Sequence, residues 1–319
     1  MRYATLTLNP CLDHLIALET SFQPGALHWF DSTTLLAGGK GVNVSRMLQW
    51  LGAKSDAFGF CGGQTGELLC SILKKEGIAQ RFTKTKAQTR LCVKFTDADG
   101  ICSELNAKGG PIGRAEFSAL LSDMSDYLLK KNKEEEPTTV FLCGSVPRGI
   151  SQEVYADLIL FFDEKRVKNL RFVLDADAGA LSAGLSKRPY LVKPNRAELS
   201  SVLGFTVDSA QTALYAAKRI YEEYGTRVCV TLGAEGSLYV GDEGTYLVNA
   251  PAAVLRGFVG AGDVYLATLV YSMDQKLPME ECLCRAASMA GAKVQSRNAV
   301  PPSEETVEEI AARVQVKKI

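Results

Sequence analysis

Histidine is scarce in this 319-residue chain, where His14 and His28 are the only two. A zinc site built on histidine or a Ser–His triad therefore has little material. The nine cysteines include no Cys-x-x-Cys pair, and the Cys282–Cys284 spacing does not suit metal ligands. We expect these thiols to be small apolar fillers in a protein of the reducing cytoplasm.

An excess of one charge is also missing, because Lys plus Arg and Asp plus Glu each number 36. A global field for nucleic acid or anionic membranes is not indicated, although a local basic pocket is still allowed. No apolar run approaches about 18 residues, and the N-terminus lacks the apolar core of a signal peptide. We therefore expect no nucleic-acid partner and no membrane span.

Short apolar strands alternate with amphipathic helices along most of the chain. The first ten residues alternate as a strand that ends at Pro10, and a helix after Gly41 carries Val44, Leu48 and Leu51 on one face. This rhythm predicts an α/β fold with a doubly wound, mostly parallel sheet covered by helices. Further strands are predicted at 57–60, 139–143, 172–175, 190–193 and 228–232, and further helices at 66–76 and 117–128.

Two segments, roughly 11–36 and 89–108, break this alternation. Strands are predicted in them at 12–18, 28–36, 91–95 and 101–105, with a turn at Asp97–Gly100. They would form a small β-sheet that projects from the main body as a lid. Because no repeat or low-complexity linker divides the chain, we expect a single domain over 1–319.

Ligands of a doubly wound sheet bind at the carboxyl ends of its strands. Polar and glycine-rich segments follow the predicted strands at that end, which favours an active site there. These segments are Asp13, the run Gly38 to Asn43, Asp175, the run Lys193 to Glu198, and the run Thr231 to Gly236.

The most informative segment is Val259-Gly260-Ala261-Gly262-Asp263, which precedes the apolar run 264–270. If that run is a helix, its N-terminal N–H groups attract an anion, and glycines let a phosphate approach closely. A carboxylate beside a bound phosphate suits a base that deprotonates an attacking hydroxyl. A tight turn with Asp263 as a helix-start residue explains the segment equally well. Neither this segment nor the run Gly38 to Asn43 has the glycine spacing of a P-loop or of a dinucleotide-binding loop, which disfavours a nicotinamide oxidoreductase.

The runs 38–44 and 259–263 together resemble the two signatures of the PfkB, or ribokinase-like, carbohydrate kinases. The resemblance covers essentially the whole chain, and the opening Asn9-Pro10-x-x-Asp13 is similar to the branch acting on phosphorylated ketohexoses. That branch contains 1-phosphofructokinase, tagatose-6-phosphate kinase and minor 6-phosphofructokinases. Other matching segments are Thr89-Arg90, Glu104-Leu105-Asn106, the run Cys143 to Gly149, and Lys193-Pro194-Asn195 with Glu198.

The resemblance implies a role for each matching residue. Asp263 would be the catalytic base, and Gly260, Ala261 and Gly262 would form the anion hole for the γ-phosphoryl group. Asn195 and Glu198 would organise Mg²⁺ through water. The substrate-binding residues would be Asp13, Gly38, Gly39, Lys40 and Asn43, with Arg90 on the existing phosphate. The residues lining the ATP site would be Lys193, Asn195, Thr231, Gly233 and Gly236.

Two of these roles have structural alternatives: Arg90 could form a surface salt bridge from a lid strand, and Glu198 could be a helix-start carboxylate. Three positions depart from the family pattern. Phe258 replaces a usual Ser or Thr, Val264 replaces a usual Ser, and His28-Trp29 occupy a region that often holds an Arg.

The implied activity is ATP- and Mg²⁺-dependent phosphorylation of a ketohexose monophosphate to the bisphosphate. A kinase of an unphosphorylated sugar or nucleoside is the alternative enzyme, and a non-catalytic sugar-phosphate-binding protein is the alternative from another class. The family also implies a homodimer through the lid, which the alternating apolar residues of 28–36 permit.

Overall fold

The computed structural model describes residues 1–30, 32–133, 137–251, 260–295 and 302–319. Val259 and Phe258 lie outside the described residues. The strands of the larger sheet are β1 (Arg2–Thr7), β4 (Ser55–Cys61), β5 (Ala79–Lys84), β8 (Thr138–Gly144), β9 (Leu170–Ala176), β10 (Leu191–Val192), β11 (Arg227–Thr231), β12 (Ser237–Gly241), β13 (Gly244–Val248) and β14 (Val316–Lys318).

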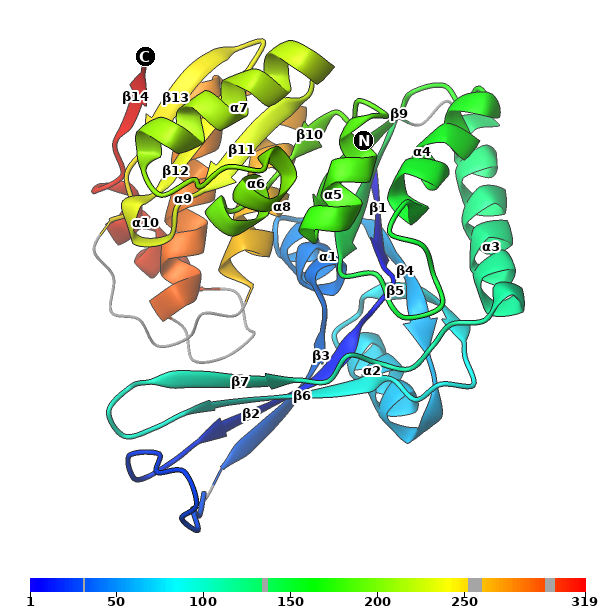
Figure 1. Ribbon diagram of the computed structural model, residues 1–319, viewed down its shortest axis with the longest axis vertical. Coiled ribbons are helices and arrows are strands. Elements are labelled where there is room, and N and C mark those ends of the chain that lie inside the picture. The colour runs from blue at the N-terminus through cyan, green and yellow to red at the C-terminus, as the bar shows by residue number, and fades with distance from the viewer. Residues whose placement is uncertain (31, 134–136, 252–259, 296–301) are drawn as a thin grey trace.

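The larger sheet has the strand order β14-β13-β12-β11-β10-β9-β8-β1-β4-β5 (Figure 1). From β11 to β5 all neighbours pair in parallel. At the other edge β12, β13 and β14 add antiparallel pairs. The predicted mostly parallel sheet is therefore confirmed.

Helices cover both faces of this sheet, because its strands bury side chains alternately on either side. In β8, Val140 and Leu142 join one core, whereas Phe141 and Cys143 join the other. The first core contains α3 (Arg114–Lys133), α4 (Val154–Glu164), α5 (Ala178–Leu185), α6 (Arg196–Leu203) and α7 (Ala210–Tyr224). The second contains α1 (Lys40–Trp50), α8 (Ala261–Asp274) and α9 (Met279–Gln295), with α10 (Glu304–Ala311) against α9, and α2 (Gly63–Lys75) packs in a smaller third cluster.

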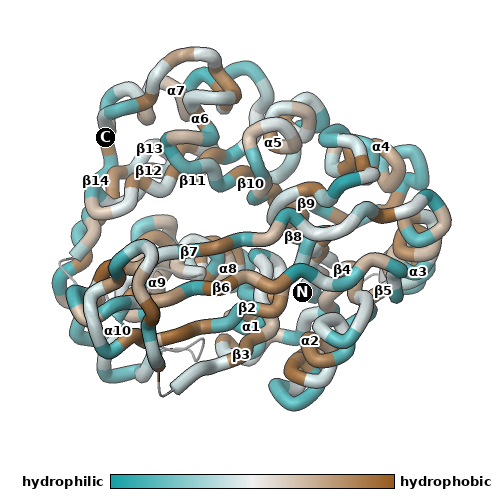
Figure 2. Tube along the Cα trace, turned by 60° about the horizontal axis from the view of Figure 1, so that its bottom comes forward, coloured by the Kyte–Doolittle hydropathy of each residue, from teal (hydrophilic) through white to brown (hydrophobic). Residues whose placement is uncertain are grey.

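The smaller sheet consists of β3 (Thr33–Gly38), β2 (Cys11–Ala17), β6 (Arg90–Thr96) and β7 (Cys102–Asn106), in that order. These strands lie side by side below the larger sheet (Figures 1 and 2). β2 and β6 pair in parallel, and each has an antiparallel neighbour on its other side. The predicted separate β layer from 11–36 and 89–108 is confirmed.

Part of the predicted strand over 28–36 is wrong, since β3 begins at Thr33 and Trp29 is 76 % exposed. β5 and the antiparallel edge were not predicted from the sequence. β5 is half exposed and has Phe82 as its one large apolar residue, so its alternation is weak. In the described part of the chain no helix is long and apolar enough to cross a membrane.

Candidate active site

The carboxyl ends of the parallel strands carry several of the predicted site residues. Asp175 is the penultimate residue of β9, Lys193 directly follows β10, and Thr231 ends β11. The first turns of α1, α6 and α8 meet at this edge, because Lys40 of α1 contacts Asp175 and Glu198, and Asn43 of α1 contacts Asp263. The structure thus brings together residues that are separated by more than 200 positions, such as Asn43 and Asp263.

Asp263 lies in the first turn of α8 and is 7 % exposed. The Asn43 amide donates a hydrogen bond to its Oδ2 at 2.8 Å. Burial and the negative charge of Asp175 raise the pKa of Asp263 to about 6, although Lys40, Asn43 and Lys193 act in the opposite direction. A carboxylate with this pKa is ionised near neutrality and is basic enough to accept a proton.

The glycines before Asp263 allow a close approach to the helix terminus. Gly260 has φ 82°, in the left-handed region that favours glycine, and a Cβ there would lie 3.1 Å from Asn43 Nδ2. A Cβ on Gly262 would lie 3.3 Å from Lys193 Nζ. The first helical hydrogen bond runs from Val264 N–H to the Gly260 carbonyl at 2.9 Å. The N–H groups of Ala261, Gly262 and Asp263 precede it, so they are the ones that helix geometry leaves for an anion.

Two lysines flank the buried carboxylate of Asp175, which is 1 % exposed. Lys40 Nζ lies 2.7 Å from its Oδ1, and Lys193 Nζ lies 3.0 Å from its Oδ2. Burial is the largest single effect and would lower the pKa of both lysines, but the negative charges of Asp175 and Asp263, together with the hydrogen bond to Asp175, outweigh it and raise the pKa of each lysine. Both lysines therefore stay protonated, and they place two positive charges beside the carboxylates of Asp175 and Asp263.

Asn195 and Glu198 form a capping box at the start of α6. Asn195 Oδ1 accepts from Glu198 N–H at 2.9 Å, and Glu198 Oε2 accepts from Asn195 N–H at 2.8 Å. Glu198 is therefore a helix-start carboxylate, as the structural alternative predicts. The box leaves Glu198 Oε1 directed to the site, where it lies 3.7 Å from Lys40 Nζ.

Thr231 pairs with Asn195 in an isolated parallel bridge, which joins the end of β11 to the start of α6. After it comes the short 3₁₀ helix η1 (Gly233–Glu235), with Gly233 at φ 63°. Gly236 has φ 102°, and a Cβ there would lie 2.0 Å from the Val248 carbonyl oxygen. Glycine is required at Gly236 by this crowding and by its dihedral angle. The loop therefore borders the same edge as the capping box.

The predicted sugar-binding residues meet where the smaller sheet joins α1. Asp13 is 4 % exposed and pairs with Lys94, whose Nζ lies 3.1 Å from Asp13 Oδ1. A Cβ on Gly38 would lie 2.3 Å from Asp13 Oδ2, so only glycine leaves room for this carboxylate. Gly39, at φ 121°, turns the chain from β3 into α1, which presents Asn43 to Asp263.

Arg90 begins β6, opposite Cys11 in the parallel ladder. Its guanidinium donates to the carbonyl of Asn9 at 2.9 and 3.1 Å and to that of Ala107 at 3.2 Å. These acceptors are neutral, so they hold the side chain in place without compensating its charge. A small pocket is lined by Arg90 together with Asn9, Thr89, Gly109 and Gly110.

Sequence reasoning does not single out two charged side chains of this region, Lys94 and Arg46, and gives Asp175 no specific role. Lys94 lies two residues after Cys92, and its position in an alternating strand could have indicated that it faces Asp13. Arg46 donates a hydrogen bond to Asn43 Oδ1 at 2.9 Å, and Glu76 holds the Arg46 guanidinium in place. Because its oxygen is bound to Arg46, the Asn43 amide directs its nitrogen toward Asp263. The sequence places Asp175 at a strand end, but it does not show its two lysine partners, because they come from other segments of the chain.

A family model described as pfkB family carbohydrate kinase matches residues 6–306. The chain belongs to this family. This carbohydrate kinase is 31% identical over 315 residues to a 1-phosphofructokinase of Bacillus subtilis, which covers 99% of both chains. It is 31% identical over 297 residues to a 1-phosphofructokinase of Escherichia coli K12, covering 93% of this chain and 92% of that one.

Among solved structures, phosphofructokinase-2 from Escherichia coli in complex with substrates and products resembles the kinase with a TM-score of 0.87. That pair is 27% identical, and the match covers 98% of this chain and 99% of the other. The predicted family membership and the ribokinase-like fold, with its large sheet and separate small sheet, are therefore confirmed.

Proposed function

We propose that this kinase transfers the γ-phosphoryl group of ATP to a hydroxyl of a ketohexose monophosphate and so forms the bisphosphate. Asp263 carries this proposal. It is a buried carboxylate with a pKa raised to about 6, in the helical turn whose N–H groups can hold a phosphoryl anion. A residue that merely started a helix would gain nothing from burial beside a second carboxylate, Asp175.

In the proposed reaction the sugar hydroxyl oxygen attacks the γ-phosphorus in line. The O–H proton passes to Asp263, the new O–P bond forms, and the bond to the ADP oxygen breaks. N–H groups of Ala261, Gly262 and Asp263 stabilise the charge on the phosphoryl oxygens. Lys40 and Lys193 add positive charge next to this turn, and Asn43 holds Asp263 in position.

Magnesium is proposed to be held at the start of α6. Hard cations prefer oxygen donors, and the Asn195–Glu198 pair offers an amide and a carboxylate whose Oε1 is outside the capping box. Because Lys40 Nζ lies 3.7 Å from that oxygen, a hydrated ion suits the site better than direct ligation. Bound Mg²⁺ would neutralise phosphate charge. Lys193, Asn195, Thr231, Gly233 and Gly236 are proposed to line the ATP site.

For the sugar, we propose that Asp13, Gly38, Gly39, Lys40 and Asn43 bind the substrate and that Arg90 binds its existing phosphate. Arginine is suited to phosphate oxygens because its planar fork donates several hydrogen bonds. Fructose 1-phosphate is the first candidate, since full-length relatives carry the name 1-phosphofructokinase. Fructose 6-phosphate is the second, supported by the likeness to phosphofructokinase-2.

A coupled assay of ADP formation tests this proposal. kcat/KM is compared for fructose 1-phosphate, fructose 6-phosphate and tagatose 6-phosphate, with unphosphorylated fructose, ribose and adenosine as controls. A phosphorylated ketohexose should exceed every control by orders of magnitude. A higher kcat/KM for a control would favour the alternative kinase, and no ADP with any sugar would favour a non-catalytic binding protein.

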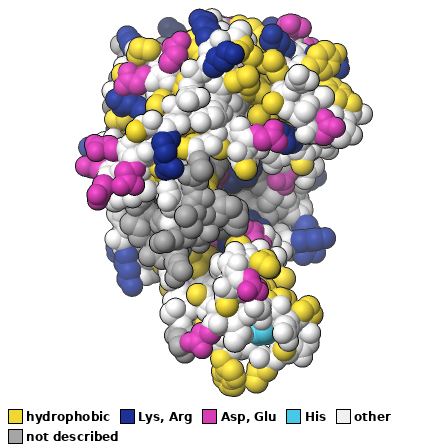
Figure 3. All heavy atoms as spheres, turned by 90° about the vertical axis from the view of Figure 1, so that its left-hand side faces the viewer, with side chains coloured by type: hydrophobic (Ala, Val, Ile, Leu, Met, Phe, Trp, Pro, Cys, Tyr) yellow, Lys and Arg dark blue, Asp and Glu magenta, His cyan; other side chains and the backbone are white. Residues whose placement is uncertain are grey.

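We also propose that the smaller sheet acts as a lid within a single domain and pairs with a second copy to form a homodimer. One face of it carries the cross-strand row Leu35, His14, Val93 and Leu105. Leu35 is 40 % and Leu105 63 % exposed. Figure 3 shows hydrophobic side chains on the lobe that this sheet forms. Burial of such a row against its symmetry mate would remove it from water.

A cytoplasmic location is proposed from the thiols. All nine cysteines are free, and six of them are buried, three of these in the second core cluster, as expected of reduced side chains.

A further inference from the structure

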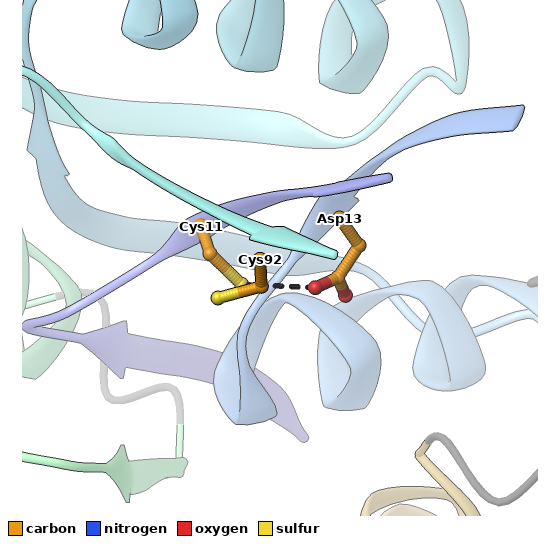
Figure 4. Close-up of side chains that lie close together, drawn as sticks. All are labelled: Cys11, Asp13 and Cys92. Carbon is orange, nitrogen blue, oxygen red and sulfur yellow. Dashed lines mark hydrogen bonds between the residues drawn. The ribbon is translucent and has the colours of Figure 1, made fainter. Parts of the chain in front are cut away.

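A cluster of two thiols and a carboxylate lies on the smaller sheet. Asp13 in β2 pairs with Cys92 in β6 across the parallel ladder, and Cys11 precedes Asp13 by two residues, so all three share one face. Figure 4 shows the three side chains pointing toward one another. One ligand atom from each lies within 4.8 Å of the others, and Cys11 Sγ donates to Asp13 Oδ1 at 3.3 Å.

We propose that Cys11, Asp13 and Cys92 form a Zn²⁺ site and that zinc competes there with the sugar substrate for Asp13. Zinc takes thiolate and carboxylate ligands in tetrahedral geometry, at about 2.3 Å to sulfur and about 2.0 Å to oxygen. Those lengths place neighbouring ligand atoms roughly 3.5–3.8 Å apart. The cluster needs only small side-chain movements to reach this spacing, and a solvent molecule would take the fourth position.

Charge balance supports the site. On binding, each thiol loses its proton to water, so two thiolates and one carboxylate carry three negative charges. Zn²⁺ neutralises two of them. Lys94, whose Nζ is 3.1 Å from Asp13 Oδ1, neutralises the third. Because Cys11, Asp13 and Cys92 are each at most 4 % exposed, this neutrality avoids the cost of a buried net charge.

The thiols also distinguish this cluster from another thiol pair in the chain. Cys61 and Cys70 interact through their side chains, but among the described residues only the Cys11–Asp13–Cys92 group unites three candidate ligands. A two-ligand pair binds zinc more weakly than a three-ligand site. Cys70 therefore provides a matched control.

Competition with sugar rests on the proposed role of Asp13 in sugar binding, whereas metal binding does not. A zinc-ligated Asp13 can no longer accept hydrogen bonds from sugar hydroxyls with that oxygen. The proposed ATP-site residues lie at the carboxyl ends of the larger sheet's strands and in the segments that follow them, so nucleotide binding should not compete with zinc.

The test is a titration of the full-length, reduced protein with Cd²⁺, followed by the ultraviolet charge-transfer absorption of cadmium–thiolate bonds, with Zn²⁺ as competitor. We expect one ion per chain and two thiolates per ion. Cys92→Ser should weaken binding at least 100-fold, and Cys70→Ser should leave it within about 2-fold of wild type. Equal affinity of Cys92→Ser and wild type, or equal loss in both variants, overturns the site.

The competition is tested by repeating the titration with saturating fructose 1-phosphate and, separately, fructose 6-phosphate. At least one should weaken cadmium binding more than 10-fold, whereas unchanged affinity with both overturns competition at Asp13. Since these titrations contain no ATP and measure no turnover, a failure of the proposed kinase reaction would leave the metal result intact and remain distinguishable.

Discussion

Replacing Asp263 by Asn should stabilise the free enzyme even though it removes the proposed catalytic base. Burial and Asp175 raise the pKa of this carboxyl from 3.8 to about 6. Each pKa unit corresponds to about 1.4 kcal/mol, so the ionised group costs about 3 kcal/mol of folding free energy at neutral pH. Asparagine carries no charge but loses the charge-assisted part of the Asn43 bond, which leaves a net gain of about 1–3 kcal/mol.

The pH dependence of this gain follows from the direction of the pKa shift. The folded state binds the Asp263 proton more tightly than the unfolded state does. The destabilisation is therefore absent below about pH 3.8, grows as pH rises, and is complete above about pH 6. The stability advantage of Asp263→Asn should be largest at pH 8 and about 1.4 kcal/mol smaller at pH 5, where the cost of the ionised carboxylate is roughly half as large.

Urea unfolding at pH 5 and pH 8 measures this advantage. Asp126→Asn is the matched control, because Asp126 is an exposed residue of α3 and its replacement should change the free energy of unfolding by less than about 0.5 kcal/mol. An Asp263→Asn protein that is less stable than wild type at pH 8, or whose advantage does not grow from pH 5 to pH 8, would refute the reasoning.

Three further predictions concern the phosphate, the metal and the dimer. Arg90→Ala should raise the KM for the sugar phosphate about 10- to 100-fold, because the charge-assisted hydrogen bonds that it removes are worth about 1.5–3 kcal/mol. The KM for ATP should change little, and equal effects on both substrates would contradict the phosphate role. Glu198→Gln keeps an oxygen for the capping box but loses its charge, so we expect a several-fold higher Mg²⁺ requirement at nearly unchanged stability. An unaltered Mg²⁺ titration would remove Glu198 from the metal site. Leu105→Glu should shift the protein from dimer to monomer in sedimentation velocity, whereas Leu160→Glu, at a position 40 % exposed on α4, should not; a dimer in both variants would place the interface elsewhere.

The parallel half of the fold could be predicted because burial leaves a simple pattern in the sequence. β8 reads as a continuous apolar strand since both of its faces are covered, and the stripe of Val44 and Leu48 follows helical periodicity. The antiparallel edge could not be predicted in the same way. There β12 and β13 are short, and β13 pairs on its outer side with β14, which is distant in the sequence.

The glycine turns and Asp263 could be recognised from the sequence because their chemistry is local. The partners that change the pKa of Asp263 could not, since Asn43 is 220 positions away in the sequence and Asp175 lies in β9, far from α8 along the chain. The same limit applies to Asn195 and Glu198. Their spacing indicates both a capping box and a metal pair, and the structure contains the first without excluding the second.

The cysteine cluster could not be found from spacing at all. Cys11 and Cys92 are 81 residues apart and meet because β2 and β6 pair in parallel. Metal-ligand spacing in a sequence reports only ligands that are near neighbours along the chain.

The most direct test of the central claim is the turnover of Asp263→Asn with ATP and the preferred fructose phosphate, together with its affinity for ATP. The account predicts that kcat falls at least 10²- to 10⁴-fold, as expected for loss of a general base, while the Kd for ATP changes by less than about 3-fold. Asp126→Asn should retain full activity in the same assay. Near-normal turnover of Asp263→Asn would contradict the assignment of Asp263 as the base.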